Sequence, residues 1–277
     1  MRLGFAVLLA FRLPSSLPAR QPTPNGLAHW LDLTWLGQAA NLEPLRWVFF
    51  GMLILYVSGR CMALALPILF AVHLGVFTLG NSQGWIGHTD QIVTLILLVQ
   101  TIFHFGHLAR RSSGTLNEHT VGDLEIFYTQ QTIAATYVVA ALTKLIKTGG
   151  SWITQLPNIT VQIVKTNDQF YYDSLAHPNP GFAEWLNGMI IHHPWIAYPL
   201  FAPGLIIELA AFIIVYGRRP AIVMGLVLVG MHALIILVMQ ITFSTNIALI
   251  VIYLLNVPWL LAMALRRRTS AIPDGGK

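Results

Sequence analysis

Several ionisable side chains lie within or at the ends of long apolar runs, where a charge is costly, and four of them are the main candidates for chemistry: Lys144, Glu208, His232 and His88. At the centre of a membrane helix a charged residue costs about 2.5–3.5 kcal/mol on insertion scales, so each needs a partner or a function. Glu208 and His232 are in mid-run, and we expect both to face the interior of a helical bundle. Lys144 is near the end of its run, so it has the alternative of extending to the membrane interface.

Spacing places Lys144 with other polar residues. Gln130, Tyr137 and Lys144 recur every seven residues, which puts them on one face of a helix. His88 starts the preceding apolar run and reaches the same membrane face as Lys144 by topology, although a histidine there is also typical of a helix start. Topology thus brings an amine and an imidazole to one membrane face, either as parts of one site or as two separate interfacial groups.

The remaining candidates for metal or redox chemistry are weaker. His104 and His107 have the i, i+3 spacing of two metal ligands, but no acidic residue or cysteine is nearby, so interfacial packing is the preferred interpretation. His73 lies alone in mid-run and is expected to be a hydrogen-bonded interior group. Cys61 is the only cysteine, which excludes an intrachain disulfide and a thiolate cluster. No metal site is predicted.

The elements that must position these residues are membrane helices. Of the 277 residues 55% are hydrophobic and only 10% are charged, against about 25% charged in soluble domains. Lipid must therefore be the solvent for much of the chain. A span needs about 20 mainly apolar residues, and seven runs are long enough or close to it: Leu45–Val57, Cys61–Gly80, Thr89–Leu108, Leu124–Ile146, Trp195–Tyr216, Pro220–Ile241 and Asn246–Leu265. The predicted fold is an all-α, polytopic integral membrane bundle of about seven transmembrane helices.

The expected organisation has three parts. Residues 1–43 form an N-terminal interfacial and linker segment, 44–266 the transmembrane domain, and 267–277 a cytoplasmic tail. The long connection 148–194, rich in aromatic residues and proline, is predicted to form short interfacial helices on the outer face. Arginines gather in the loops of one side, so the positive-inside rule makes that side and the C-terminus cytoplasmic, in a cell membrane. Because the cations lie between apolar runs, the partner is the lipid bilayer and not nucleic acid.

The order of these residues resembles the horizontally transferred transmembrane domain family, which includes the membrane half of vitamin K-dependent gamma-carboxylase. The resemblance covers roughly residues 45–258, and it rests on Arg46, His88, Gln131, Tyr137, Ala140, Ala141, Lys144, Leu145, Trp152, Glu208, His232, Phe243 and Asn246. It implies that Lys144 is a neutral amine that deprotonates a lipid quinol, with His88 helping to stabilise the species formed after that proton transfer. Glu208 and His232 would support this chemistry. The quinol would be bound by Gln131, Tyr137, Trp152 and Asn246. Thr143 stands where the carboxylase has a second lysine, so protein carboxylation itself is not expected.

Three functions remain as hypotheses. The preferred one is a non-enzymatic membrane factor, acting in maturation, immunity or transport, with a membrane or secreted protein as partner. The alternative is an intramembrane enzyme, a gamma-carboxylase-like lyase or oxidoreductase that uses Lys144 as base on a lipid quinol or another small molecule. A remote alternative is an electron carrier that binds b-type haem through His73 and His232.

Overall fold

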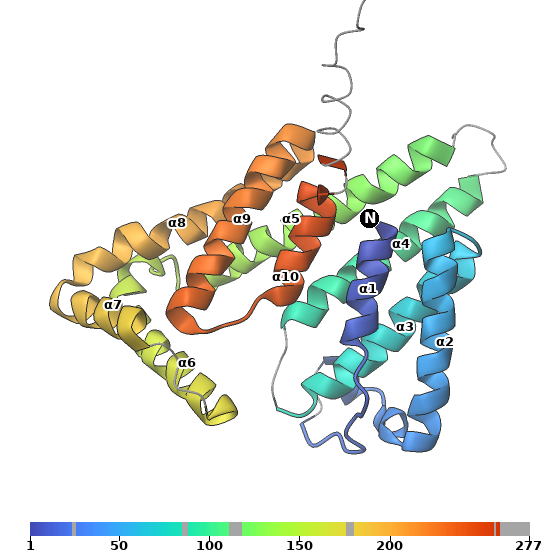
Figure 1. The fold of residues 1–277 in the computed structure, drawn as a ribbon, viewed down its shortest axis with the longest axis horizontal. Coiled ribbons are helices and arrows are strands. Elements are labelled where there is room, and N and C mark those ends of the chain that lie inside the picture. The colour runs from blue at the N-terminus through green and yellow to red at the C-terminus, as the bar shows by residue number, and fades with distance from the viewer. Residues whose placement is uncertain (24–25, 85–87, 111–117, 176–179, 258, 261–277) are drawn as a thin grey trace, which may run out of the picture. The chain divides into compact units, whose positions relative to one another are not determined.

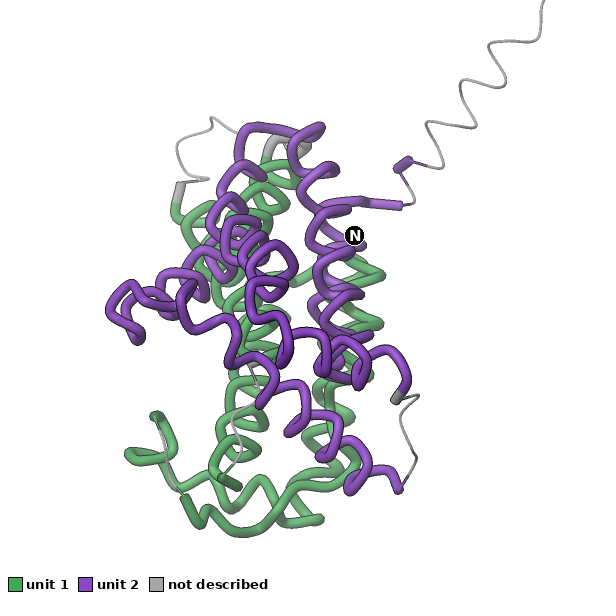
Figure 2. Tube along the Cα trace, turned by 90° about the vertical axis from the view of Figure 1, so that its left-hand side faces the viewer, with its two compact units in different colours: residues 1–133 green, residues 134–277 purple. Residues whose placement is uncertain are grey.

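The protein is described by a computed structural model over residues 1–23, 26–84, 88–110, 118–175, 180–257 and 259–260. Every regular element in these ranges is helical, so the predicted all-α fold is confirmed there. The chain divides into two compact units, residues 1–133 and 134–277, shown in separate colours in Figure 2. The division falls inside one helix, α5 (Glu118–Lys147), and the transmembrane domain predicted over 44–266 stays a prediction. The predicted tail, 267–277, lies outside the described residues.

Unit 1 is a set of packed helices that begins with α1 (Arg2–Arg12), labelled in Figure 1. Two short 3₁₀ turns, η1 (Gly26–His29) and η2 (Thr34–Gly37), follow. The long helices are α2 (Ala39–Ser58), α3 (Met62–Asn81) and α4 (His88–Arg110). α3 packs against both α2 and α4, and α1 packs against α2, so α2 and α3 form the centre of the unit.

The turn between α2 and α3 shows how the local sequence ends one helix and begins another. Gly59 follows α2 with a φ of 71°, and its N–H donates to the carbonyls of Leu55 and Tyr56. Glycine adopts this left-handed conformation without a Cβ penalty, so it is suited to close a helix. Two residues later Cys61 has a φ of 51° and precedes α3. The two apolar runs are thereby separated into two helices.

Unit 2 contains the end of α5 and a chain of shorter helices. The 3₁₀ turn η4 (Ile153–Asn158) leads into α6 (Ile159–Ser174), which is followed by α7 (Pro180–His192). The turn η5 (Pro194–Ile196), the helix α8 (Ala197–Ala210) and the 3₁₀ segment η6 (Ala211–Tyr216) then run on almost continuously. After α9 (Arg218–Met239), the helix α10 (Ser244–Leu249) passes into a π-helical turn, η7 (Ile250–Leu255).

α9 is the centre of unit 2, because it packs against α6, α7, α8, η6, α10 and η7. A buried apolar cluster joins the predicted outer connection to α9; it includes Leu156, Ile163, Leu186, Ile190 and Val238. The region 148–194 therefore consists largely of short helices. Its place at a membrane surface stays a prediction.

Five of the described helical segments are long and apolar enough to cross a membrane: Ala39–Ser58, Met62–Asn81, Thr89–Ala109, Pro194–Tyr216 and Arg218–Met239. They correspond to five of the seven predicted runs. The run 124–146 lies within α5, which is helical but more polar, with two glutamates, one aspartate and two lysines over Glu118–Lys147. The run 246–265 begins with α10 and η7, a helical segment of only twelve residues that ends at Leu255.

Candidate functional site

The central interaction of the site is an ion pair between α5 and α8 of unit 2. Lys144 Nζ donates hydrogen bonds to both carboxylate oxygens of Glu208, at 2.7 and 2.5 Å. The Glu208 side chain is only 11% exposed, whereas that of Lys144 is 37% exposed. A carboxylate removed from water needs compensation, and the two hydrogen bonds from the ammonium provide it. In this geometry Lys144 is the cationic half of a salt bridge.

The end of α5 brings an aromatic ring to the same amine. Gly149 and Gly150, with φ values of 57° and 82°, follow the helix and turn the chain. The N–H of Gly150 donates to the carbonyl of Leu145 at 2.8 Å, which closes the last turn. Trp152 follows two residues later, with its ring centroid 5.7 Å from Lys144 Nζ. A cation over an indole face at this distance is attracted by the ring, so Trp152 helps to hold the ammonium in place.

A second polar pair, Tyr137 with His232, links α5 to α9. The Tyr137 hydroxyl and His232 Nε2 are 2.7 Å apart, and the two side chains belong to residues only 5% and 3% exposed. Asn246, in α10, forms a side-chain hydrogen bond with Tyr137. Phe243 lies against the imidazole, with ring centroids 4.7 Å apart and planes inclined by 31°. The chain reversal after α9 thus returns an aromatic ring and an amide to the buried histidine.

The hydrogen-bond roles in this pair can be derived from the partners. Asn246 Oδ1 is buried and accepts no hydrogen bond from the described chain, so the amide nitrogen is the atom that donates to Tyr137. The Tyr137 hydroxyl is then free to donate to His232 Nε2. A neutral imidazole carries its proton on the other nitrogen, Nδ1, which is also buried and has no partner among the described residues. One buried donor and one buried acceptor are therefore left unsatisfied, which is costly without a further ligand or water.

The two pairs are electrostatic neighbours. The Glu208 charge acts on Tyr137, and the Lys144 charge acts on His232. Tyr137 and Lys144 are seven residues apart on α5, on one face of that helix. The structure therefore brings six of the eight predicted site residues into unit 2, as two bonded groups, Lys144 with Glu208 and Trp152, and Tyr137 with His232 and Asn246. We call these six residues the polar cluster.

The other two predicted residues belong to unit 1. Gln131 lies on α5, six residues before Tyr137, and is half-buried. His88 is the first residue of α4, and its side chain is outside the described part of the structure. The predicted neighbourhood of His88 and Lys144 therefore stays a prediction.

The geometry gives little support to haem ligation by His232. Its Nε2 is occupied by the Tyr137 hydroxyl, and its Nδ1 is fully buried. Neither nitrogen is accessible to iron in this conformation. Among the described residues no group of three or more histidine, cysteine or acidic side chains is placed to hold a metal ion.

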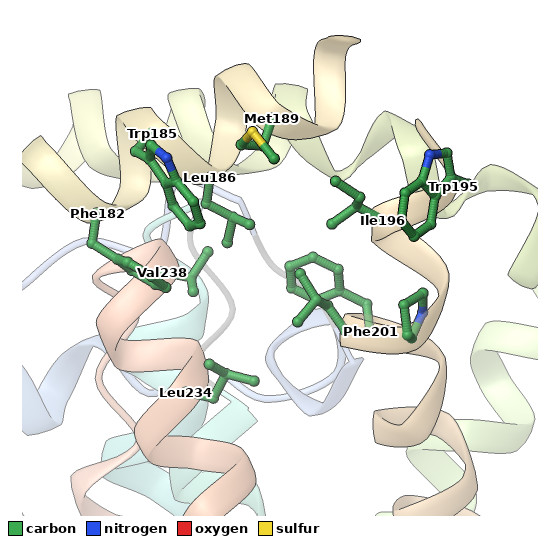
Figure 3. A pocket seen from close by; sticks show the side chains of 11 residues that line it. Phe182, Trp185, Leu186, Met189, Trp195, Ile196, Phe201, Leu234 and Val238 are labelled. Atoms are coloured by element: carbon green, nitrogen blue, oxygen red, sulfur yellow. The ribbon is translucent and has the colours of Figure 1, made fainter. Parts of the chain in front are cut away.

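An apolar cavity of about 330 Å³ is lined in part by α8 and α9, two of the helices that carry the cluster (Figure 3). Its walls come from α7, η5, α8 and α9, and they are formed by Phe182, Trp185, Leu186, Met189, Trp195, Ile196, Pro199, Leu200, Phe201, Leu234 and Val238. Phe201 precedes Glu208 by seven residues on α8, so the two are about 10 Å apart along one helix face. Phe201 and Trp152 also pack against the same buried apolar cluster.

Sequence reasoning missed two ion pairs of unit 1. Arg2 donates to Glu125 at 2.9 Å, and Arg12 Nε donates to Asp90 at 2.7 Å. The sequence indicated that these acidic residues need a cationic partner, because both lie at the start of apolar runs. The arginines of α1 are the partners that only the fold identifies.

Comparison with protein-family models, with curated proteins and with solved structures found no match to this chain. The family resemblance seen in the sequence therefore stays a prediction.

Proposed function

We propose that this protein is a multi-pass membrane factor without catalytic activity, acting in maturation, immunity or transport of another molecule. The observation that carries this proposal is the contact of Lys144 Nζ with both oxygens of Glu208. An ammonium held in this way has no lone pair with which to take up a proton. The pair instead supports a structural role, joining α5 to α8 within unit 2.

The proposal is tested by removing both charges together. The double variant Lys144→Met/Glu208→Leu replaces the ion pair by apolar side chains, an exchange that is often neutral for stability. Cells that express the wild type and the double variant at equal levels are compared by untargeted mass spectrometry of lipids and small molecules. A membrane factor gives the same profile for both proteins. A product that requires the two charged residues contradicts the proposal.

The second candidate is an intramembrane enzyme that uses Lys144 as base on a lipid quinol or another lipophilic molecule. Two observations favour it: the polar cluster leaves His232 Nδ1 and Asn246 Oδ1 unsatisfied, and an apolar cavity is lined in part by α8 and α9, which carry Glu208 and His232. The apolar part of a substrate would occupy the cavity, and its polar head would reach the cluster. Glu208 would have to take the proton of Lys144, or separate from it, before the amine could act as base.

The retained ligand separates the two candidates. The protein is purified in mild detergent, and the bound quinones and lipids are identified by mass spectrometry in the wild type and in Leu186→Trp, which fills part of the cavity. A quinone present in the wild type and lost in Leu186→Trp supports the enzyme. An identical set of lipids in both proteins argues for the factor.

A further inference from the structure

A second cavity, of about 360 Å³, is lined only by residues of unit 1, and none of them belongs to the polar cluster. Its apolar walls include Phe11 and Leu17, at and after the end of α1, and Val76 and Phe77 of α3. Its volume is at the lower end of the range of small-molecule sites, about 300–1,000 Å³. A lipophilic body of modest size fits walls of this composition.

The charged groups of this cavity neutralise one another. Arg12 Nε and Nη2 both donate to Asp90 Oδ1, and the two side chains are 30% and 23% exposed. The pair ties the end of α1 to the first turn of α4. Because one cation faces one anion, the cavity offers no net charge, and an uncharged ligand suits it better than an ion.

His73 lines the cavity, and one of its ring nitrogens has no hydrogen-bond partner among the described residues. His73 is 4% exposed, and its Nδ1 lies 2.9 Å from the hydroxyl oxygen of Thr94. The hydroxyl of Thr94 donates its only proton to the carbonyl of Asp90, at 2.9 Å. With the Thr94 proton in that bond, His73 Nδ1 is the donor to Thr94, which corresponds to the tautomer with the proton on Nδ1. In the neutral ring this leaves Nε2 as an acceptor, and nothing in the described chain donates to it.

We propose that unit 1 binds a neutral lipophilic alcohol in this cavity. The hydroxyl of the ligand donates to His73 Nε2, and its hydrocarbon part lies against Phe11, Leu17, Val76 and Phe77. Thr94 fixes the ring so that Nδ1 is occupied and Nε2 is available. The Arg12–Asp90 pair closes one side of the site and excludes ions by leaving neither charge free.

The test uses the full-length protein in lipid nanodiscs and two photoreactive probes. One is a medium-chain alkyl alcohol that carries a diazirine, and the other is its methyl ether, which has the same chain but no hydroxyl proton. Labelled residues are located by mass spectrometry. The wild type should label the walls of the unit 1 cavity with the alcohol about three- to tenfold more than with the ether, the ratio expected for one hydrogen bond. In the apolar cavity of unit 2 the two probes should label equally.

Two variants isolate the contribution of His73. His73→Phe removes the acceptor and should lower labelling by the alcohol to the level of the ether, while labelling by the ether is unchanged and reports an intact cavity. His73→Gln restores an acceptor near the position of Nε2 and should recover part of the difference. Equal labelling of the unit 1 cavity by both probes in the wild type overturns the proposal, and this result does not depend on whether a variant folds. The proposal is also overturned if an excess of the same alcohol without the diazirine does not reduce the labelling, because labelling that cannot be competed reports no saturable site.

Discussion

Replacing Lys144 by methionine should lower the free energy of unfolding of unit 2 by more than the replacement of an exposed lysine would. The change removes the cation that accompanies Glu208, whose side chain is 11% exposed. Loss of one partner of a fully buried ion pair costs about 3–5 kcal/mol, and loss of a surface partner about 0–1 kcal/mol. With Lys144 at 37% exposure the pair lies between these cases, and we expect a loss of about 2–3 kcal/mol in the free energy of unfolding.

Removing the other partner of the ion pair, Glu208, should lower the free energy of unfolding by less. Glu208→Leu leaves a lysine that can extend towards water on its long side chain, so we expect a loss of about 1 kcal/mol. The double variant Lys144→Met/Glu208→Leu leaves no buried charge and should lose about 0–1 kcal/mol. The two single losses sum to about 3–4 kcal/mol and thus exceed the loss of the double variant by about 2–4 kcal/mol, which is the coupling between the two residues.

The assay is unfolding by SDS in mixed micelles, followed by circular dichroism, for the wild type and the three variants. Lys147→Met, in the last turn of the same helix, removes an exposed lysine and is the matched control, with an expected change within about 0.5 kcal/mol. The reasoning is refuted if Lys144→Met costs no more than Lys147→Met. It is also refuted if the double variant loses the full sum of the single losses.

Three further predictions use the same unfolding measurement. Gly225→Ala should cost about 1–3 kcal/mol, because a Cβ there would lie 3.0 and 3.1 Å from two leucine side chains of η7. The control Gly230→Ala on the same helix meets nothing within 4 Å and should be neutral or slightly stabilising. Equal effects of the two changes would contradict the packing of α9 on η7. Tyr137→Phe should cost about 1–3 kcal/mol because it leaves His232 Nε2 buried without a partner. Adding His232→Phe should recover part of that loss. A double variant no more stable than Tyr137→Phe alone would argue against the hydrogen bond. Gly59→Ala should cost about 1–2 kcal/mol because of its φ of 71°, and an unchanged stability would show that α2 does not end in a left-handed residue.

The helices were predictable because apolar runs of about 20 residues have few alternatives in lipid. The runs Cys61–Gly80 and Pro220–Ile241 differ from α3 and α9 by one or two residues at each end. α5 was harder to delimit, because it extends over Glu118–Lys147 and its first turns are polar. The division of the chain inside this helix leaves no mark in composition, since a continuous helix can belong to two packed units.

The sequence named the residues of the polar cluster as candidates, but it did not show which of them pair. A glutamate and a histidine in mid-run must find partners, because an unsatisfied polar group is costly in lipid. Which partner each finds depends on how helix faces meet, and a linear sequence does not contain that information. Glu208 therefore could not be matched to Lys144, nor His232 to Tyr137, from spacing alone. The same reason explains why Arg12 and Asp90, on two helices of unit 1, were not recognised as a pair.

The protonation state of Lys144 tests the central claim most directly. Solid-state NMR of the protein in lipid bilayers, with nitrogen-15 in the lysine side chains and carbon-13 in the glutamate carboxyls, reports that state and the separation of Lys144 from Glu208. The ion pair predicts an ammonium shift for Lys144 and a nitrogen-to-carboxyl distance short enough for a direct hydrogen bond. A neutral amine, or an amine well separated from the carboxylate, would contradict it and return Lys144 to the role of a base.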